Sequence, residues 1–173
     1  MKVSHSQLAT WRRCPREWSY RYIDKRVSRT PTKSLVIGKS VHEALAAYHS
    51  GQPWMLSDPA MRALLVAYAA RWVDAPERVT EVDVEFSFQL SEGIEMVGEL
   101  DAIGVSGEKK FLMEHKTTSE DISPGSAYWR KIFYVDAQVS TYLHAARALG
   151  IEEVIYDVLR KPALRLGKKE TEQ

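Results

Sequence analysis

Two acidic residues and a lysine lie in the middle of the chain with a spacing that suits metal-assisted chemistry on a phosphate. They are Asp101, Glu114 and Lys116, and one residue, His115, separates the last two. Alternate side chains of a strand share a face, so Glu114 and Lys116 would be neighbours. Carboxylates bind a hard cation such as Mg²⁺, which lowers the pKa of its bound water. The lysine can orient or activate that water and face developing negative charge.

The same residues also have an ordinary structural interpretation. A Glu-x-Lys on a strand is usually a solvated ion pair of little consequence. The catalytic interpretation requires Asp101 to lie on the neighbouring strand, close enough to share an ion with Glu114. His42, which begins the run His42-Glu43-Ala44-Leu45, would be a structural histidine in most helices of this kind.

The elements that would position these residues follow from the periodicity of apolar residues. Ser6 is the expected cap of a first helix, which Pro15 splits in two. Further helices are expected over residues 34–50 and from residue 59 onward. Alternation predicts strands over 81–90, 94–105 and 110–116, joined by two short turns as an antiparallel meander. A loop over 117–125, one long helix to about residue 149 and a nearly all-apolar strand over 154–159, buried on both faces, complete the pattern.

This order predicts an α/β (mixed α+β) fold with a central mixed sheet of about four strands flanked by helices. The last strand–helix–strand connection is what parallel pairing requires. At 173 residues and 45% hydrophobic content, we expect a single domain over 1–173. Its parts would be a helical region at 1–75, a catalytic core at 80–160 and a frayed tail at 161–173.

The charges are unevenly distributed although the net charge is only +1. Residues 1–40 contain ten Lys/Arg and two Asp/Glu, whereas residues 41–108 contain three Lys/Arg and twelve Asp/Glu. Such a chain suits an enzyme whose cations hold phosphates and whose carboxylates hold a metal; charges scattered over a soluble surface are the alternative. We expect no signal peptide, membrane span or internal disulfide, because no apolar run is long enough and Cys14 is the one cysteine. A cytoplasmic location is therefore expected.

Five segments together resemble a known family. Asp101 with Glu114-His115-Lys116-Thr117 resembles the signature of the PD-(D/E)XK nucleases, and the chain is more closely similar to their RecB-like exonuclease branch, of the CRISPR-associated and phage-encoded type. The other segments, in the order of that branch, are Ser4-His5-Ser6 with Cys14-Pro15-Arg16-Glu17-Trp18, Gly38 to Glu43, Gly98 to Asp101, and Gln138 to Tyr142. The resemblance implies a restriction-endonuclease-like core.

The resemblance also implies a metal centre. Asp101 and Glu114 would ligate Mg²⁺ or Mn²⁺, helped by the backbone carbonyl of His115. His42 would be a further ligand from the second long helix. Many RecB-like nucleases also hold an iron–sulfur cluster through four cysteines; Cys14 matches the first of these and the other three are absent, so we predict no cluster.

Lys116 would be the catalytic lysine in this comparison. Gln138 and Tyr142, one helical turn apart, would help to position DNA and the lysine, with packing of the helix as the alternative. Thr117, which follows the lysine, would contact DNA. Tyr128 and Trp129 could stack on a base or pack in the core. A phosphate path is expected along four arginines, each of which could instead be a plain surface residue: Arg12, Arg13, Arg16 and Arg21.

These observations together predict a Mg²⁺- or Mn²⁺-dependent deoxyribonuclease. Its mode would be exonucleolytic, on single-stranded DNA or duplex ends, in recombination, repair or phage DNA metabolism. A recombination or annealing protein is a possible partner. The alternatives are a catalytically inactive DNA-binding module and a nuclease-like scaffold subunit of a larger complex.

Overall fold

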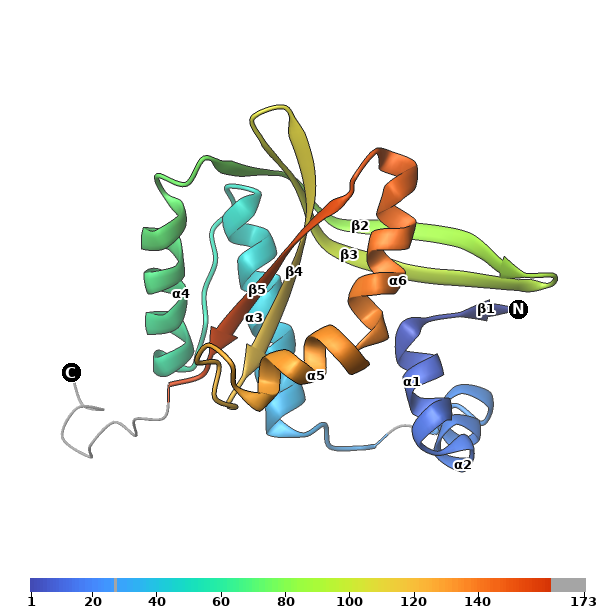
Figure 1. Ribbon diagram of the computed structural model, residues 1–173. Helices are drawn as coiled ribbons and strands as arrows, with labels where there is room; N and C mark the ends of the chain where they lie inside the picture. The colour runs from blue at the N-terminus through green and yellow to red at the C-terminus, as the bar shows by residue number, and fades with distance from the viewer. Residues whose placement is uncertain (27, 163–173) are drawn as a thin grey trace.

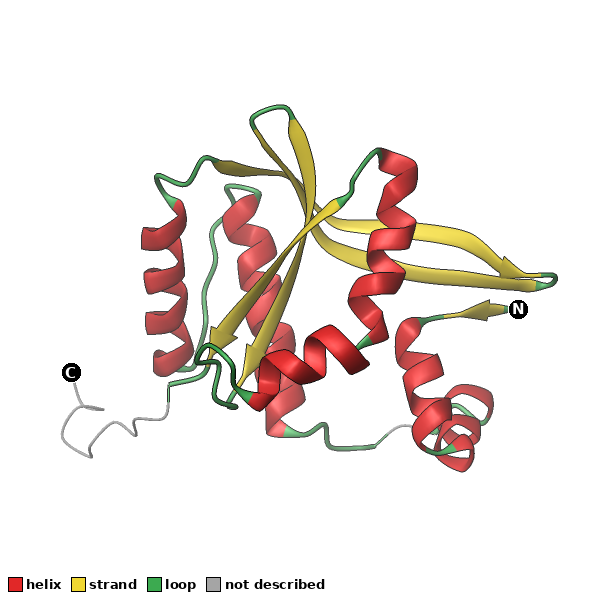
Figure 2. Ribbon diagram, in the orientation of Figure 1, coloured by secondary structure: helices red, strands yellow, loops and turns green. Residues whose placement is uncertain are grey.

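The computed structural model describes residues 1–26 and 28–162, so most of the expected tail, 163–173, lies outside the described residues. The helices and strands, drawn in Figure 2, follow the predicted order except for an added first strand and a division of the predicted long helix. They are β1 (Lys2–Val3), α1 (His5–Arg13), α2 (Pro15–Trp18), a π-helical turn (Ser19–Ile23), α3 (Lys33–His49), α4 (Pro59–Trp72), β2 (Glu77–Ser91), β3 (Ile94–Ser106), β4 (Lys109–Thr118), α5 (Ala127–Val135), α6 (Ala137–Ala146), a 3₁₀ turn (Arg147–Leu149) and β5 (Glu153–Arg160). None of the described helices is both long and apolar enough to span a bilayer.

The sheet is mixed and has five strands. β2 and β3 form a long antiparallel hairpin, β4 runs antiparallel to β3, and β5 runs parallel to β4. The predicted α/β fold, with a mixed sheet flanked by helices, is thereby confirmed. The strand that the sequence did not predict is β1, which pairs in parallel with Glu95 and Met96 of β3. Two residues carry no periodicity, so no pattern could have indicated it.

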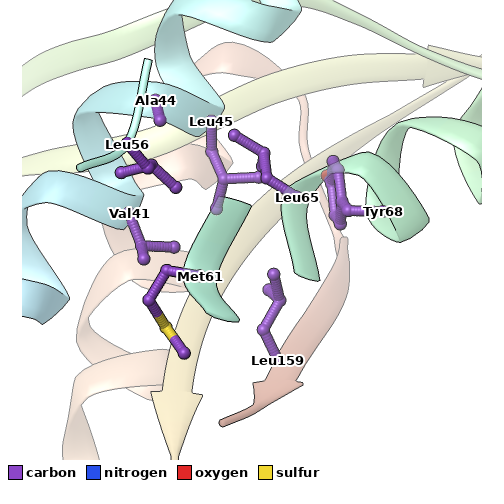
Figure 3. Close-up of a cluster of buried hydrophobic side chains, with 8 residues drawn as sticks. All are labelled: Val41, Ala44, Leu45, Leu56, Met61, Leu65, Tyr68 and Leu159. Carbon is purple, nitrogen blue, oxygen red and sulfur yellow. The ribbon is translucent and has the colours of Figure 1, made fainter. Parts of the chain in front are cut away.

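Helices cover both faces of the sheet (Figure 1). Helices α3 and α4 pack against each other and against β5 through a buried cluster, drawn in Figure 3: Val41, Ala44, Leu45, Leu56, Met61, Leu65, Tyr68 and Leu159. Helix α6 covers the opposite face, where Ala146 packs with Leu100 and Leu112 of the sheet. The two layers hold the middle of β4 from both sides, which is the part of the chain where the acidic residues and the lysine lie.

Two helix boundaries are explained by their capping side chains. Asp58 caps α4 by accepting hydrogen bonds from the backbone N–H groups of Ala60 and Met61 at 3.0 and 3.2 Å, with Pro59 at the first helical position. The cap of α1 is Ser4 and not the predicted Ser6. The predicted split of the first helix at Pro15 is confirmed.

Two predictions for the C-terminal half were wrong. The single long helix is two helices, because Asp136 leaves the helical conformation and caps α6 by accepting a 2.8 Å hydrogen bond from the N–H of Gln138. The last strand was expected to be buried on both faces. In the structure β5 is an edge strand paired with β4, most of it is half-buried, and Leu159 is its buried residue.

Candidate active site

The acidic residues lie where two neighbouring strands separate. β2 pairs along one edge of β3, and β4 shares the other edge only from Ser106↔Lys109 to Ala102↔Met113. Asp101 precedes Ala102 on β3 and Glu114 follows Met113 on β4, so both acidic residues lie next to that last pair. Beyond it the two strands diverge, as Figure 1 shows, and β4 continues with β5 alone as its strand partner in the described chain. We call this point of divergence the fork.

Asp101 is held in the fork by two nitrogen atoms. Its Oδ1 lies 3.3 Å from Nδ1 of His42 on α3, and its Oδ2 accepts a 2.8 Å hydrogen bond from the backbone N–H of His115. Burial raises the pKa of Asp101, but His42, the His115 N–H and Lys116 together outweigh burial and lower the pKa below its ordinary value. Asp101 is therefore a carboxylate at neutral pH.

Glu114 is almost fully buried, with a 1% exposed side chain, and its Oε1 contacts the ammonium group of Lys116. Burial raises the pKa of Glu114; Lys116 lowers it, and the negative charge of Asp101 raises it further. The other oxygen, Oε2, is buried and has no hydrogen-bond partner among the described residues. A buried carboxylate oxygen without a partner is costly, so its position requires an explanation.

A divalent cation would supply the partner that Oε2 lacks. Asp101, Glu114 and His42 lie around the fork, and carboxylates and an imidazole are suitable ligands for Mg²⁺ or Mn²⁺. In residues 1–26 and 28–162, no three His, Cys, Asp or Glu side chains are grouped so that they could hold a metal ion as they stand. Asp101 contacts His42 and Glu114 contacts Lys116 instead. The donor types and the unpartnered oxygen fit the ion.

Helix α6 carries the predicted pair Gln138 and Tyr142, and it brings Tyr142 near the carboxylates of the fork. Gln138 hydrogen-bonds to the Tyr142 side chain, and the ring of Tyr142 packs edge-on against Phe86 at 5.4 Å between centroids. Burial raises the pKa of Tyr142, the Gln138 hydrogen bond lowers it, and the charges of Glu114 and Asp101 raise it further. The hydroxyl therefore lies within electrostatic reach of both carboxylates.

His115 contributes its main chain to the fork, while its side chain lies on the other face of β4. The ring is 4% exposed and packs against His49 of α3 and Tyr68 of α4. The alternation predicted for β4 is therefore present, since Leu112 packs on the α6 side and Met113 on the opposite side with Trp72 of α4. Metal ligation by the His115 carbonyl stays a prediction.

The predicted DNA-binding arginines all lie on the exposed surface of α1, α2 and the π-helical turn. Arg13 forms an ion pair with Glu17 at 2.6 Å, and Arg16 donates a hydrogen bond to the hydroxyl of Tyr20 at 3.0 Å. Arg21 lies over the ring of Tyr22. These contacts are local, between residues within four positions of each other, and leave the arginines on the surface.

Helix α1 contacts α6 and β3, the elements that carry Tyr142 and Asp101. The pKa of His5, its first residue, is lowered by burial, raised by Asp136 and lowered by Lys116 and Arg12. The positive charges of Lys116 and Arg12 therefore act on one imidazole, which places the basic helix within electrostatic reach of the lysine. Thr117, which follows that lysine, lies close to Gly38 of α3.

For Tyr128 the structure favours the packing alternative over base stacking. Tyr128 is 6% exposed and lies next to Tyr156, whose pKa it raises. Trp129 packs edge-on against Tyr128 and donates a 2.9 Å hydrogen bond from Nε1 to the carbonyl of Ile122. A ring enclosed by protein cannot stack on a base, so Tyr128 is a core residue in this structure.

Asp157 was missed by the sequence analysis. It lies opposite His115 in the β4–β5 register, and its Oδ2 is 3.0 Å from Nδ1 of the His115 ring. A signal was present, because Asp157 is the one charged residue in the otherwise apolar run over 154–159. A charge on a half-buried strand needs a partner, but the sequence does not say which.

Comparisons with known proteins agree with this geometry. A family model described as the PD-(D/E)XK nuclease superfamily matches residues 2–66 and 50–172. No curated protein matches the sequence. Among solved structures, the crystal structure of SSO0001 is similar, with a TM-score of 0.52 and 18% identity over 92% of this chain. This chain covers 62% of the SSO0001 chain, and at that identity the likeness concerns the fold alone. Because the family match extends over nearly the whole sequence and includes the strands that form the fork, the chain belongs to the PD-(D/E)XK nuclease superfamily.

Proposed function

We propose that this nuclease is a Mg²⁺- or Mn²⁺-dependent deoxyribonuclease of the RecB-like branch that hydrolyses phosphodiester bonds as an exonuclease. The observation that carries the proposal is the buried Glu114 carboxylate in the fork. Among the described residues, one of its oxygens has no hydrogen-bond partner, Lys116 contacts the other, and Asp101 acts on its pKa. A buried carboxyl group with one unpaired oxygen destabilises the fold unless that oxygen gains a further partner, such as a metal ion, so its presence is best explained by function.

The residues of the fork have distinct roles in this proposal. Asp101 and Glu114 would hold the ion, together with His42 and the carbonyl of His115. When bound, the ion lowers the pKa of a coordinated water and offsets charge on the phosphate. The ammonium group of Lys116 orients the attacking water and faces the negative charge that develops on the phosphate oxygens.

The polyanion is proposed to enter along α1. The exposed arginines of α1 and α2 would bind phosphates of any sequence, and α1 lies within electrostatic reach of Lys116. Tyr142 of α6 lies within electrostatic reach of both carboxylates, and Tyr142 and Gln138 would position the strand and the lysine. DNA as single strands or duplex ends is the proposed substrate.

The biological setting is proposed from the family resemblance. We place the activity in the cytoplasm, in recombination, repair or phage DNA metabolism, with a recombination or annealing protein as a partner and no role for a membrane. No iron–sulfur cluster is proposed, because four thiolates are needed and this chain has one cysteine.

The test uses purified protein and DNA labelled at one end or internally, single-stranded or duplex, with Mg²⁺, Mn²⁺ or a chelator. Lys116→Ala should lower the cleavage rate about 10²- to 10³-fold, with DNA binding retained. The matched control is Lys109→Ala, on the same strand and also paired with a glutamate, Glu153, but on the exposed surface. An exonuclease would release mononucleotides or short products from the end label before internal label appears in short fragments.

Each other outcome favours a different function. DNA that is bound but not cut under every metal condition would favour a catalytically inactive DNA-binding module. Neither binding nor cutting would favour a scaffold subunit of a larger complex. Cutting that survives both the chelator and Lys116→Ala would show that the activity does not come from the fork.

A further inference from the structure

The ring of His115 is anchored on the face of β4 that lies away from Glu114 and Lys116. Its Nδ1 is 3.0 Å from Oδ2 of Asp157, in direct register across the β4–β5 pair. The ring also stacks on His49, with centroids 5.7 Å apart and planes 17° apart, and meets the ring of Tyr68 edge-on. The hydroxyl of Tyr68 lies 2.7 Å from Nε2 of His49, which links the two packing partners. The ring is therefore held by a polar contact and by aromatic neighbours on α3 and α4, and the ring of His42 also lies edge-on to it at 6.4 Å.

The main chain of the same residue reaches the fork. The N–H of His115 donates its hydrogen bond to Oδ2 of Asp101 at 2.8 Å. This bond is outside the β3–β4 ladder, whose last pair is Ala102↔Met113. The backbone of His115 is therefore not fixed by backbone hydrogen bonds to β3. Its orientation depends on the pairing with β5 and on the contacts of the His115 side chain.

We propose that Asp157 is a positioning residue for the Asp101 carboxylate. Asp157 accepts the Nδ1–H of His115 and fixes the ring, and the fixed residue aims its backbone N–H at Asp101. Partners of this kind behind a metal ligand commonly set its orientation and the metal affinity. The inference rests on the proposed function, since it treats Asp101 as a metal ligand.

A purely structural role for Asp157 is the competing explanation. The Asp157 side chain is 17% exposed and the His115 side chain 4%, and a buried contact between two such polar side chains is by itself weak evidence for stability. A structural role predicts that loss of Asp157 lowers the free energy of unfolding without a specific effect on the His115 amide or on metal binding. The positioning role predicts both specific effects.

The experiment compares Asp157→Ala and Asp157→Asn with the wild type. The first readout is the ¹H–¹⁵N spectrum of metal-free protein labelled only at its five histidines, which isolates the His115 amide. The second is the dissociation constant for Mn²⁺ by calorimetry, without DNA. We expect Asp157→Ala to shift the His115 amide signal, to speed its hydrogen exchange, and to weaken Mn²⁺ binding by about tenfold. Asp157→Asn keeps an acceptor oxygen in the same place and should remain close to the wild type.

Two control variants separate positioning from general weakening. Glu153→Ala removes the Lys109–Glu153 contact at the other end of the β4–β5 pair and should change neither readout. Leu65→Ala opens a cavity in the cluster between α3 and α4, where Leu65 is 1% exposed, and lowers stability without touching Asp157. If Asp157→Ala does not fold, Asp157→Ser, which is too short to reach the ring, takes its place with the same expectations.

The proposal is overturned if the His115 amide and the Mn²⁺ affinity of Asp157→Ala match those of the wild type. It is also overturned if Leu65→Ala weakens Mn²⁺ binding as much as Asp157→Ala does. If the wild type binds no Mn²⁺, the proposed metal dependence fails, while the His115 amide still decides whether Asp157 positions that peptide. The two failures are therefore distinguishable.

Discussion

Replacing Glu114 by glutamine should make the metal-free protein more stable and the metal-bound protein less stable than the wild type. The substitution keeps the size of the side chain and replaces a carboxyl group that is 1% exposed and has one oxygen without a hydrogen-bond partner among the described residues. An unsatisfied buried polar group costs about 1–3 kcal/mol, and more when it is charged. The glutamine carbonyl can still accept from Lys116, and that lysine is 25% exposed, so the loss of the ion pair is the smaller effect.

The expected gain without metal is about 1–2 kcal/mol, which corresponds to a rise in Tm of roughly 2–8 °C for a chain of this size. Metal binding acts in the opposite direction. At a Mn²⁺ concentration about 100 times the wild-type dissociation constant, linkage stabilises the wild type by about 2.7 kcal/mol. A variant that binds about 100-fold more weakly gains only about 0.4 kcal/mol at that concentration. The order of stability should therefore reverse when Mn²⁺ is added.

Urea unfolding at neutral pH, with chelator and with Mn²⁺, measures both effects. Glu153→Gln is the control, because its side chain is 56% exposed and lies at the far end of β4 and β5; it should change neither curve. A metal-free variant that is less stable than the wild type would refute the argument from burial. A variant that Mn²⁺ stabilises as strongly as the wild type would show that Glu114 is not a ligand.

Three further predictions concern pH, the basic helix and the long hairpin. Burial, with a smaller effect of His115, lowers the pKa of His49 from 6.5 to about 4. As the pH falls, His49 is therefore protonated in the unfolded state before it is protonated in the folded state. The free energy of unfolding should fall by up to about 3 kcal/mol between pH 7 and pH 4. Because Glu114 has a raised pKa and acts in the opposite direction, the effect is isolated by comparing urea unfolding of His49→Gln with the wild type, and equal pH slopes would contradict it. Arg12→Ala should weaken DNA binding in chelator for all sequences and lower the salt slope of log K by about 1; an unchanged slope would place Arg12 outside the phosphate path. Gly98→Ala should cost about 1–3 kcal/mol in urea unfolding, because its Cβ would lie 2.6 Å from the ring of Phe86, and a neutral effect would mean that the ring moves freely.

The sequence by itself determined the parts of this protein that depend on local periodicity and local capping. The alternation from residue 81 to residue 116 gave the three-strand meander and placed Glu114 and Lys116 on one face, because a strand has a period of two. Asp58 followed by Pro59 indicated the start of α4, since a side-chain acceptor and a residue without an N–H suit the first turn. The family resemblance added His42, which no pattern within α3 distinguishes from a structural histidine.

Only the tertiary structure decided where the Asp101 side chain lies, because the alternation of side chains between the two faces of β3 breaks at this residue. Leu100 packs on the α6 side with Leu112, whereas Ala102, two residues later, packs on the opposite side with Met113. Asp101 lies at this change of face, beside the last β3–β4 pair. Its side chain is placed by the divergence of the strands and by contacts from α3 and from the main chain of β4.

The arrangement behind the fork was equally inaccessible from the sequence. His115 meets Asp157 only because β4 and β5 pair in parallel in one particular register, across 42 residues of chain. His49 and Tyr68 reach the same ring because α3 and α4 dock on that face. Local propensity fixes which residues share a face of one element, but the free energy of packing between elements decides which faces meet. The candidate residues of the fork could therefore be named from the sequence, while the contacts that orient them were decided by the fold.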